Sequence, residues 1–253
     1  MYDLLLDNSR LYDTGVFMPR YVIGVDLGKT NDYTAVCVIK VSGGYVTYPG
    51  NDELFFNPAA KPHISKPHYS LVYLERVERG TSYTKIVSGL KDMIYGGEFG
   101  SQRPEELNPL VVDATGVGVA VVDMMREAKL RPISVTITGG DKVTGKEGDF
   151  HVPKRDLVSS LVVLFQTRRI VIARDLPAFE GFVTELQNFK VKISESGHDT
   201  YEAWRQGNHD DLVLSVAIAA WYAEHIFKLH VPTEQADGGR IEDYVLLGGG
   251  GGR

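Results

Sequence analysis

The chain has 253 residues, of which 43% are hydrophobic and 24% are charged, and its formal net charge is −6. These values are those of an ordinary globular protein with a sizeable core, and they exclude a protein coated in basic surface. They do not exclude a nucleic-acid partner, because metal-binding carboxylates lower the net charge of such proteins. No apolar stretch is expected to approach the roughly 18 residues that span a membrane, and no signal-peptide pattern is seen. The single Cys37 excludes an intramolecular disulfide framework.

The first half of the chain predicts a meander of strands followed by a helix. Residues 1–20 lack sustained periodicity and are interpreted as a linker. Apolar, β-branched runs predict three strands, at 21–28, 33–39 and 69–76. The segment 42–67 is rich in glycine, proline and asparagine and is expected to be a loop. A helix is predicted over 81–95, with its apolar residues on one face.

The second half predicts alternating strands and helices. The strands are expected at 110–113, 133–138, 170–172 and 189–193. The helices are expected at 117–130, 153–167, 177–188 and 208–227. Residues 139–149 read as a glycine-rich loop or hairpin tip, and 231–253 as a flexible tail. This order predicts a single α/β domain over 21–230, with a mixed central sheet flanked by helices.

Asp26 is the most informative residue because it lies in an apolar run that predicts a buried strand. The run is YVIGVDLG, residues 21–28. An ionised carboxylate in such a place is costly unless a metal ion, a basic side chain or a proton neutralises it. The alternative is that Asp26 caps the turn at the end of its strand. The residue by itself does not decide between these two explanations.

Two further acidic sites stand where ligands gather in α/β folds. Asp113 ends a predicted strand, and Asp210 and Asp211 begin the C-terminal helix. Ligands of open α/β sheets gather at the carboxyl ends of strands. Each site also has a structural explanation, since aspartates form Asx turns and favour the first turn of a helix. If the two strands are neighbours and the helix packs against their ends, the carboxylates converge into a site for one or two Mg²⁺ or Mn²⁺ ions.

Four segments carry a resemblance to a known family. They are VIGVDLGKTNDYTA (22–35), LVVDATGVG (110–118), ITGGDKVTGKEGDFHVPKRDLV (137–158) and GNHDDLVLSVAIAAWYAE (207–224). With them the chain resembles the ribonuclease H-like nuclease superfamily and, more narrowly, the nuclease domain of phage terminase large subunits. The resemblance covers most of residues 21–225, and DATGVG and HVPKRDLV are its more specific parts.

The resemblance implies a metal-dependent endonuclease that cuts concatemeric double-stranded DNA during phage genome packaging, in the cytoplasm of the infected bacterial host. Asp26, Asp113 and Asp211 look like the catalytic, metal-binding triad, and Asp210 like a further ligand or a group behind the ligands. Two polar neighbours, Asn208 and His209, are candidates for orienting the ligands. The implied partners are double-stranded DNA, the terminase ATPase domain, the small terminase subunit and the portal, with no membrane.

Basic residues near the glycine-rich loop are candidates for holding DNA phosphates. They are Lys142, Lys146, Lys154 and Arg155. The alternative for each is a solvated surface charge. Contacts of this kind predict weak sequence preference and strong salt sensitivity. Arg168 and Arg169, in contrast, are expected to cap the C-terminus of the helix predicted over 153–167.

Other readings of the first strand lead to different function classes. Gly24-x-x-x-Gly28-Lys29-Thr30 resembles a Walker A loop, but it is one residue short and is predicted to enter a strand rather than a helix. An ATPase motor is therefore expected outside this chain. IGVDLGKT also resembles the first phosphate loop of actin-like and sugar-kinase ATPases, which need a second glycine-rich loop. Three alternatives stay open: a junction resolvase or transposase-like nuclease, an actin-like or kinase-type nucleotide-binding domain, and a non-catalytic DNA-binding domain.

Overall fold

A computed structural model describes residues 19–28, 32–47, 63–100, 107–146, 148–195 and 209–230. Most of the predicted linker, the whole predicted tail and Asn208 lie outside the described residues. The chain divides into two units, which are described separately. The larger unit consists of Pro19–Ser42 and His68–Glu224, and the smaller one includes Gly43–Pro67.

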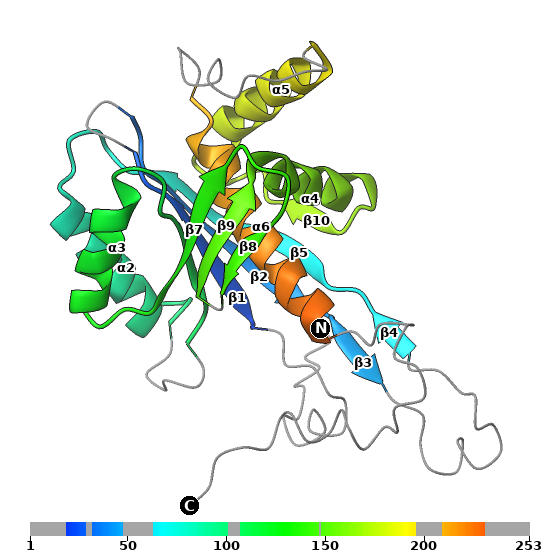
Figure 1. Cartoon of the computed structure of the whole chain (residues 1–253), viewed down its shortest axis with the longest axis horizontal. Coiled ribbons are helices and arrows are strands. Elements are labelled where there is room, and N and C mark those ends of the chain that lie inside the picture. The colour runs from blue at the N-terminus through cyan, green and yellow to red at the C-terminus, as the bar shows by residue number, and fades with distance from the viewer. Residues whose placement is uncertain are drawn as a thin grey trace, which may run out of the picture. The chain divides into compact units, whose positions relative to one another are not determined.

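The larger unit is built on a mixed sheet with the strand order β10-β5-β2-β1-β6-β7-β9-β8 (Figure 1). Its strands are β1 (Tyr21–Asp26), β2 (Ala35–Ser42), β5 (His68–Arg76), β6 (Leu110–Asp113), β7 (Pro132–Thr138), β8 (Thr144–Lys146), β9 (Asp149–Pro153) and β10 (Ile170–Ile172). β1, β6, β7 and β9 pair in parallel, whereas β2 is antiparallel to both of its neighbours, β1 and β5. The predicted α/β architecture, a mixed central sheet flanked by helices, is confirmed.

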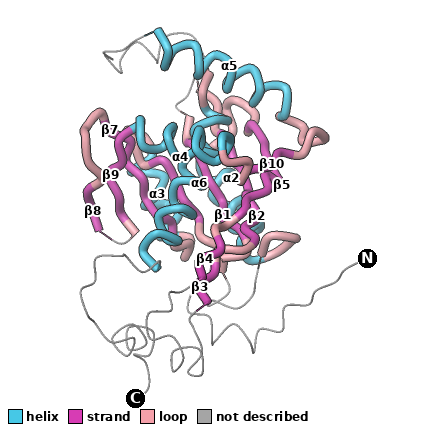
Figure 2. The backbone as a smooth tube through the Cα atoms, turned by 90° about the vertical axis from the view of Figure 1, so that its right-hand side faces the viewer, coloured by secondary structure: helices cyan, strands magenta, loops and turns pink. Residues whose placement is uncertain are grey.

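Helices cover both faces of this sheet (Figures 1 and 2). They are α2 (Tyr83–Tyr95), α3 (Gly118–Glu127), α4 (Lys154–Gln166), α5 (Phe179–Glu195) and α6 (Asp211–His230). Successive side chains of a strand point to opposite faces. Ile23 and Val25 of β1 therefore join the buried cluster formed with α2 and α3, whereas Gly24 between them faces α6. β1 is thus covered on both sides, which explains its unbroken apolar sequence.

Helix α6 packs directly against the backbone of β1. A Cβ atom added at Gly24 would collide with the backbone oxygen of Ser215 and lie 2.9 Å from the Cβ of Ala219. The Cys37 thiol, opposite Gly24 on β2, donates a weak hydrogen bond of 3.3 Å to the same Ser215 oxygen. Small side chains on both elements permit this close approach. The position of the start of α6 is therefore fixed relative to the end of β1.

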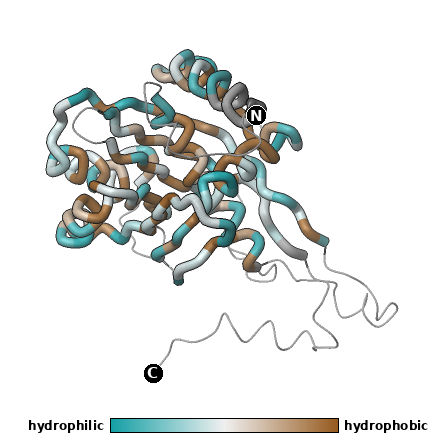
Figure 3. The backbone as a smooth tube through the Cα atoms, turned by 45° about the horizontal axis from the view of Figure 1, so that its top comes forward, coloured by the Kyte–Doolittle hydropathy of each residue, from teal (hydrophilic) through white to brown (hydrophobic). Residues whose placement is uncertain are grey.

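The apolar character of α6 exceeds what the sequence analysis expected. Asp211–Leu229, 19 residues with a mean hydropathy of 1.4, is long and apolar enough to cross a membrane by length and composition. The expectation that no stretch approaches that length is wrong. However, 72% of the window is buried inside the protein, as in the core helix of a globular domain. Figure 3 shows apolar segments in the interior and hydrophilic segments in the outer loops.

Other differences from the predicted elements have simple causes. The predicted strand at 189–193 is instead the last part of α5, because no glycine or proline ends the helix before it. The predicted loop at 42–67 contains β3 (Tyr45–Thr47) and β4 (His63–Ser65), which form an antiparallel pair in the smaller unit. The hairpin tip expected within 139–149 is confirmed, since β8 pairs antiparallel with β9.

Candidate active site

Asp26 and Asp113 end two neighbouring parallel strands. Val25 of β1 lies opposite Val112 of β6, so the two aspartates that follow them meet at the same edge of the sheet. The two carboxyl groups lie close enough that the negative charge of Asp113 raises the pKa of Asp26. The backbone N–H of Thr115 also donates to Asp113 Oδ1 at 2.8 Å. The Asx turn considered as an alternative for Asp113 is therefore present, and it holds the carboxylate towards Asp26.

The four predicted acidic residues converge around Asp26. Burial raises the pKa of Asp26 well above its usual value, and the negative charges of Asp113, Asp210 and Asp211 raise this pKa further. Such mutual effects require that the four carboxyl groups lie close together. β1, β6 and the N-terminal end of α6 thus bring together residues that are far apart in the sequence.

Basic side chains neutralise the two aspartates contributed by the end of α6. Arg76, the last residue of β5, donates from Nε to Asp211 Oδ2 at 2.7 Å and from Nη2 to Asp211 Oδ1 at 3.4 Å. Lys154, the first residue of α4, donates from Nζ to Asp210 Oδ2 at 2.9 Å. In the described part of the chain, no three His, Cys, Asp or Glu side chains are arranged to hold a metal ion. Arg76 and Lys154 instead supply positive charge to this cluster.

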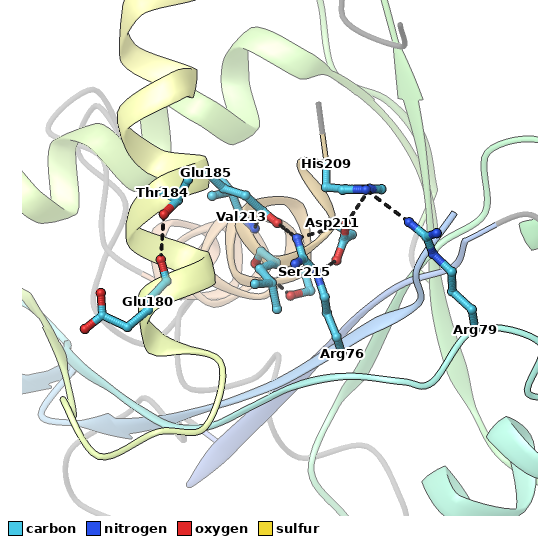
Figure 4. A network of polar contacts seen from close by, with 10 residues as sticks. Arg76, Arg79, Glu180, Thr184, Glu185, His209, Asp211, Val213 and Ser215 are labelled. Atoms are coloured by element: carbon cyan, nitrogen blue, oxygen red, sulfur yellow. Dashed lines mark hydrogen bonds and ion pairs between the residues drawn. The ribbon is translucent and has the colours of Figure 1, made fainter. Parts of the chain in front are cut away.

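Arg76 also joins the site to α5 through Glu185, a residue that the sequence analysis missed. The guanidinium is ion-paired with Glu185, whose Oε2 accepts a hydrogen bond of 2.9 Å from the backbone N–H of Val213 in the first turn of α6. Figure 4 shows this network. Burial raises the pKa of Glu185 to about 8, although the Val213 N–H opposes this shift. The signal that pointed to Asp26, a charge at the end of an apolar strand, also applies to Arg76.

His209 lies between Asp211 and a second arginine. Its Nδ1 is 3.9 Å from Asp211 Oδ1, and its Nε2 is 3.2 Å from Arg79 Nη2. The predicted place of His209 beside a candidate ligand is therefore observed. Its suggested partner Asn208 lies outside the described residues.

The four residues predicted to contact DNA have different surroundings. Lys142 and Lys146 are exposed around the β8 hairpin. Lys154 is engaged by Asp210, and Arg155 forms an exposed ion pair of 2.7 Å with Asp141. The structure therefore gathers Lys154, but not the other three, against the carboxylates.

The cap of the helix C-terminus expected from Arg168 and Arg169 is present in their backbone: the N–H of Arg168 donates to the Phe165 carbonyl at 3.1 Å, and that of Arg169 to the Leu164 carbonyl at 2.9 Å. The Arg169 side chain has a different partner. Its guanidinium forms two hydrogen bonds, of 2.7 and 2.9 Å, with the carboxylate of Glu224 on α6. Tyr69 donates to the same carboxylate at 2.6 Å. Arg169 and Glu224 are both buried. The guanidinium is therefore positioned by this carboxylate, which is distant in the sequence, rather than by the carbonyl groups at the end of its own helix.

The connection after β1 excludes a Walker A loop. β1 is followed by β2, not by a helix, so no helix N-terminus points at the Gly28 turn from this connection. The backbone N–H of Gly28 donates to Thr34 Oγ1 at 3.1 Å. The predicted strand-to-strand connection is confirmed.

The convergence of acidic residues at one edge of the sheet is expected to lower the stability of the metal-free protein. Asp26→Asn is expected to raise the free energy of unfolding of the metal-free protein by about 1–2 kcal/mol at pH 7, because it removes one of the crowded negative charges. Since the pKa of Asp26 is raised in the folded state, its stabilising contribution is present below pH 4 and is lost as the pH rises through the folded-state pKa. Urea unfolding of both proteins from pH 4 to pH 8 would show the gain of the variant growing with pH. A gain that is absent at pH 8 would contradict this explanation.

The fold is a mixed sheet with helices on both faces and carboxylates at one edge, and its sequence relatives are terminase large subunits. No family model matches the chain. It is 23% identical over 201 residues to the terminase large subunits of Thermus virus P23-45 and Thermus phage G20c, over 79% of this chain and 31% of each relative. The chain therefore spans about a third of the length of these curated relatives. The predicted resemblance to terminase large subunits is confirmed.

Solved structures with a similar fold include two terminase nucleases. The large terminase nuclease of phage G20c with bound magnesium has a TM-score of 0.47 and 21% identity, covering 81% of this chain and 84% of that chain. The human cytomegalovirus terminase nuclease domain, soaked with Mn, has a TM-score of 0.43 and 11% identity, covering 86% of this chain and 89% of that chain. Both likenesses are distant.

Proposed function

We propose that residues 21–230 form the nuclease domain of a phage terminase large subunit, a metal-dependent endonuclease that cuts concatemeric double-stranded DNA during genome packaging. The observation that carries this proposal is the convergence of Asp26 and Asp113 with Asp210 and Asp211 at one edge of the sheet. The terminase large subunits found as sequence relatives support the same assignment. The domain would act in the cytoplasm of the infected bacterial host.

The donor set of this cluster is of the type that binds Mg²⁺ or Mn²⁺, although its side chains would have to rearrange to hold one or two ions. Its oxygens are the hard ligands that these ions prefer, and the raised pKa of Asp26 shows that the crowded carboxylates need positive charge. When bound, such ions activate water and stabilise the charge that develops on a scissile phosphate. Asp26, Asp113 and Asp211 would hold the metal, with Asp210 as a further ligand or behind it.

The surrounding residues would tune this metal centre. Arg76 donates to both oxygens of Asp211, and His209 lies beside the same carboxylate, so both would orient it. Lys154 performs the same role for Asp210. Lys142, Lys146 and Arg155 remain candidates for contacting DNA phosphates. The proposed partners are double-stranded DNA, a terminase ATPase domain, the small terminase subunit and the portal.

Metal-dependent digestion of plasmid DNA tests the proposal. The wild-type protein should cut with Mg²⁺ or Mn²⁺ and stop when a chelator is added. Asp26→Asn should lower the rate by on the order of 100-fold or more, because it removes a metal ligand while preserving the shape of the side chain. The matched control is Asp123→Asn, which makes the same change of charge on an exposed side chain of α3 and should leave the rate unchanged.

Equal cutting by wild type and Asp26→Asn would contradict the assignment. A strong preference for four-way junctions over linear duplex would instead indicate a junction-resolving nuclease of the same fold. A thermal shift with ATP and Mg²⁺ that survives Asp113→Ala, without any cutting, would indicate a nucleotide-binding domain.

A further inference from the structure

A cluster of Tyr33, Arg79 and His209, here called the Tyr33 cluster, lies beside the candidate metal ligands. Tyr33 precedes β2, Arg79 lies between β5 and α2, and His209 precedes α6. The guanidinium of Arg79 lies 4.1 Å from the centre of the Tyr33 ring, and that of Arg76 lies 5.0 Å from it. The His209 ring meets the Tyr33 ring edge-on, with centroids 5.0 Å apart. The ring of Tyr33 therefore contacts the side chains of Arg76, Arg79 and His209, which come from three parts of the chain.

The hydrogen bonding of His209 connects this cluster to the carboxylates. Arg79 can only donate, so His209 Nε2, at 3.2 Å, must accept. The proton of the neutral ring is then on Nδ1, which points towards Asp211 Oδ1 at 3.9 Å. Figure 4 shows the resulting row of side chains, from Arg79 through His209 to Asp211. Arg79 is thus held at a fixed place next to a candidate metal ligand.

Arg79 differs from the other basic residues around the site in having no acidic partner. Arg76 is paired with Asp211, Lys154 with Asp210 and Arg155 with Asp141. Among the described residues, Arg79 forms no ion pair with a carboxylate, and its side chain is exposed. Stacking on Tyr33 fixes the orientation of the Arg79 guanidinium, and the N–H groups that do not bind His209 can still donate hydrogen bonds. A guanidinium in this arrangement matches the oxygens of a phosphate group.

The neighbouring cavity is not the place for an anion. It measures about 170 Å³ and is lined by Gly28, Thr34 and the residues that follow β5, but Asp32 and Glu78 also face it. These acids would repel a phosphate inside the cavity. Arg79 also lines this cavity, so the part of its exposed side chain that faces solvent is the part that suits a DNA backbone.

We propose that Arg79, positioned by Tyr33 and His209, binds a backbone phosphate of duplex DNA next to the scissile phosphate. This inference rests on the proposed nuclease function. It adds Arg79 to the candidates for contacting DNA phosphates, beside Arg155, which is paired with Asp141. Tyr33 and His209 act through Arg79 and are positioning residues.

Salt-dependent DNA binding tests the contact without requiring cutting. Fluorescence anisotropy with a short labelled duplex, in chelator and from about 0.05 to 0.2 M salt, would give the Kd and its salt slope. Arg79→Ala should weaken binding about 5–10-fold and reduce the slope by about one unit, as expected for the loss of one phosphate contact. Arg126→Ala is the matched control, since this exposed arginine lies on α3 and is paired with Asp123. It should change neither quantity.

The aromatic platform is tested by two substitutions of Tyr33. Tyr33→Leu should weaken binding in the same direction as Arg79→Ala, because the guanidinium loses the ring on which it stacks. Tyr33→Phe keeps the ring and should bind like wild type. Thermal unfolding of each variant would confirm that the fold is retained.

The outcomes separate this inference from the proposed function. If Arg79→Ala binds duplex with the affinity and slope of Arg126→Ala, or if wild type does not bind duplex, the inference is overturned, whether or not the protein cuts. If wild type fails to cut with Mg²⁺ or Mn²⁺ but the effect of Arg79→Ala is present, the DNA contact stands and the nuclease assignment fails.

Discussion

Arg76→Met is expected to lower the free energy of unfolding by about 3 kcal/mol at pH 7, because it leaves buried acids without their counter-charge. The exposed fractions are 27% for the Arg76 side chain, 7% for Asp211 and 5% for Glu185, so water replaces the lost guanidinium poorly. The substitution also removes the link between the end of β5 and the first turn of α6. Urea unfolding of wild type and variant would measure the difference.

The pH dependence of this loss distinguishes an electrostatic cause from a packing cause. Burial raises the pKa of Glu185 to about 8 even though Arg76 lowers it, so without Arg76 this acid keeps its proton to a higher pH, and the loss should be larger above pH 8 than at pH 5. Arg76→Lys keeps the positive charge but not the several N–H donors of the guanidinium. Its free energy of unfolding should therefore fall less than that of Arg76→Met. Arg126→Met, which breaks an exposed pair with Asp123, should cost less than about 1 kcal/mol. A loss for Arg76→Met that is equal at pH 5 and pH 9 would contradict the electrostatic explanation.

Gly24→Ala is expected to lower the free energy of unfolding by about 3 kcal/mol, because the added methyl group has no space between β1 and α6. Its carbon would collide with the backbone oxygen of Ser215 and lie 2.9 Å from the Ala219 Cβ and 3.0 Å from the Cys37 sulfur. Backbone atoms of a strand and a helix cannot move aside as a flexible side chain can. The helix must shift, and with it Asp211.

Gly89→Ala, in the middle of α2, provides the control for the intrinsic effect of replacing glycine. An added Cβ there meets no atom within 4 Å. This substitution should stabilise the protein by about 0.5–1 kcal/mol through helix propensity. Thermal and urea unfolding of the two variants should therefore change in opposite directions. Gly24→Ala should also slow any metal-dependent cutting, and retention of wild-type stability would show that α6 does not lie as close to β1 as described.

The parts of the fold that depend on local patterns could be predicted from the sequence. The apolar run of β1 and the periodic helix α2 are examples, because burial on both faces or on one face leaves a repeat that is visible in the residue order. The segment 189–193 misled because a short alternation of polar and apolar residues also fits the end of a helix. The paired strands β3 and β4 lie within a stretch rich in loop-forming residues, which obscured them.

The sequence indicated the aspartates of the candidate site, but it did not indicate Arg76 or Glu185. Asp26 and Asp113 are conspicuous because a charge interrupts or ends an apolar strand. The partners Arg76 and Glu185 could not be paired from the sequence, since their contact depends on how α5 packs against the end of β5. Arg169 shows the same limit: its distant partner Glu224 is decided by packing rather than by local order.

The close packing of α6 on β1 also has a consequence for the time at which the site appears during protein synthesis. Asp26 and Asp113 belong to strands that leave the ribosome early, but Asp210 and Asp211 reach the edge of the sheet only when α6 covers Gly24. Domains begin to fold from the N-terminal side while translation continues. A nascent chain therefore carries only half of its carboxylates until α6 has emerged and docked. If the domain cuts DNA as proposed, a nascent chain whose α6 has not yet docked is expected not to cut the DNA around it.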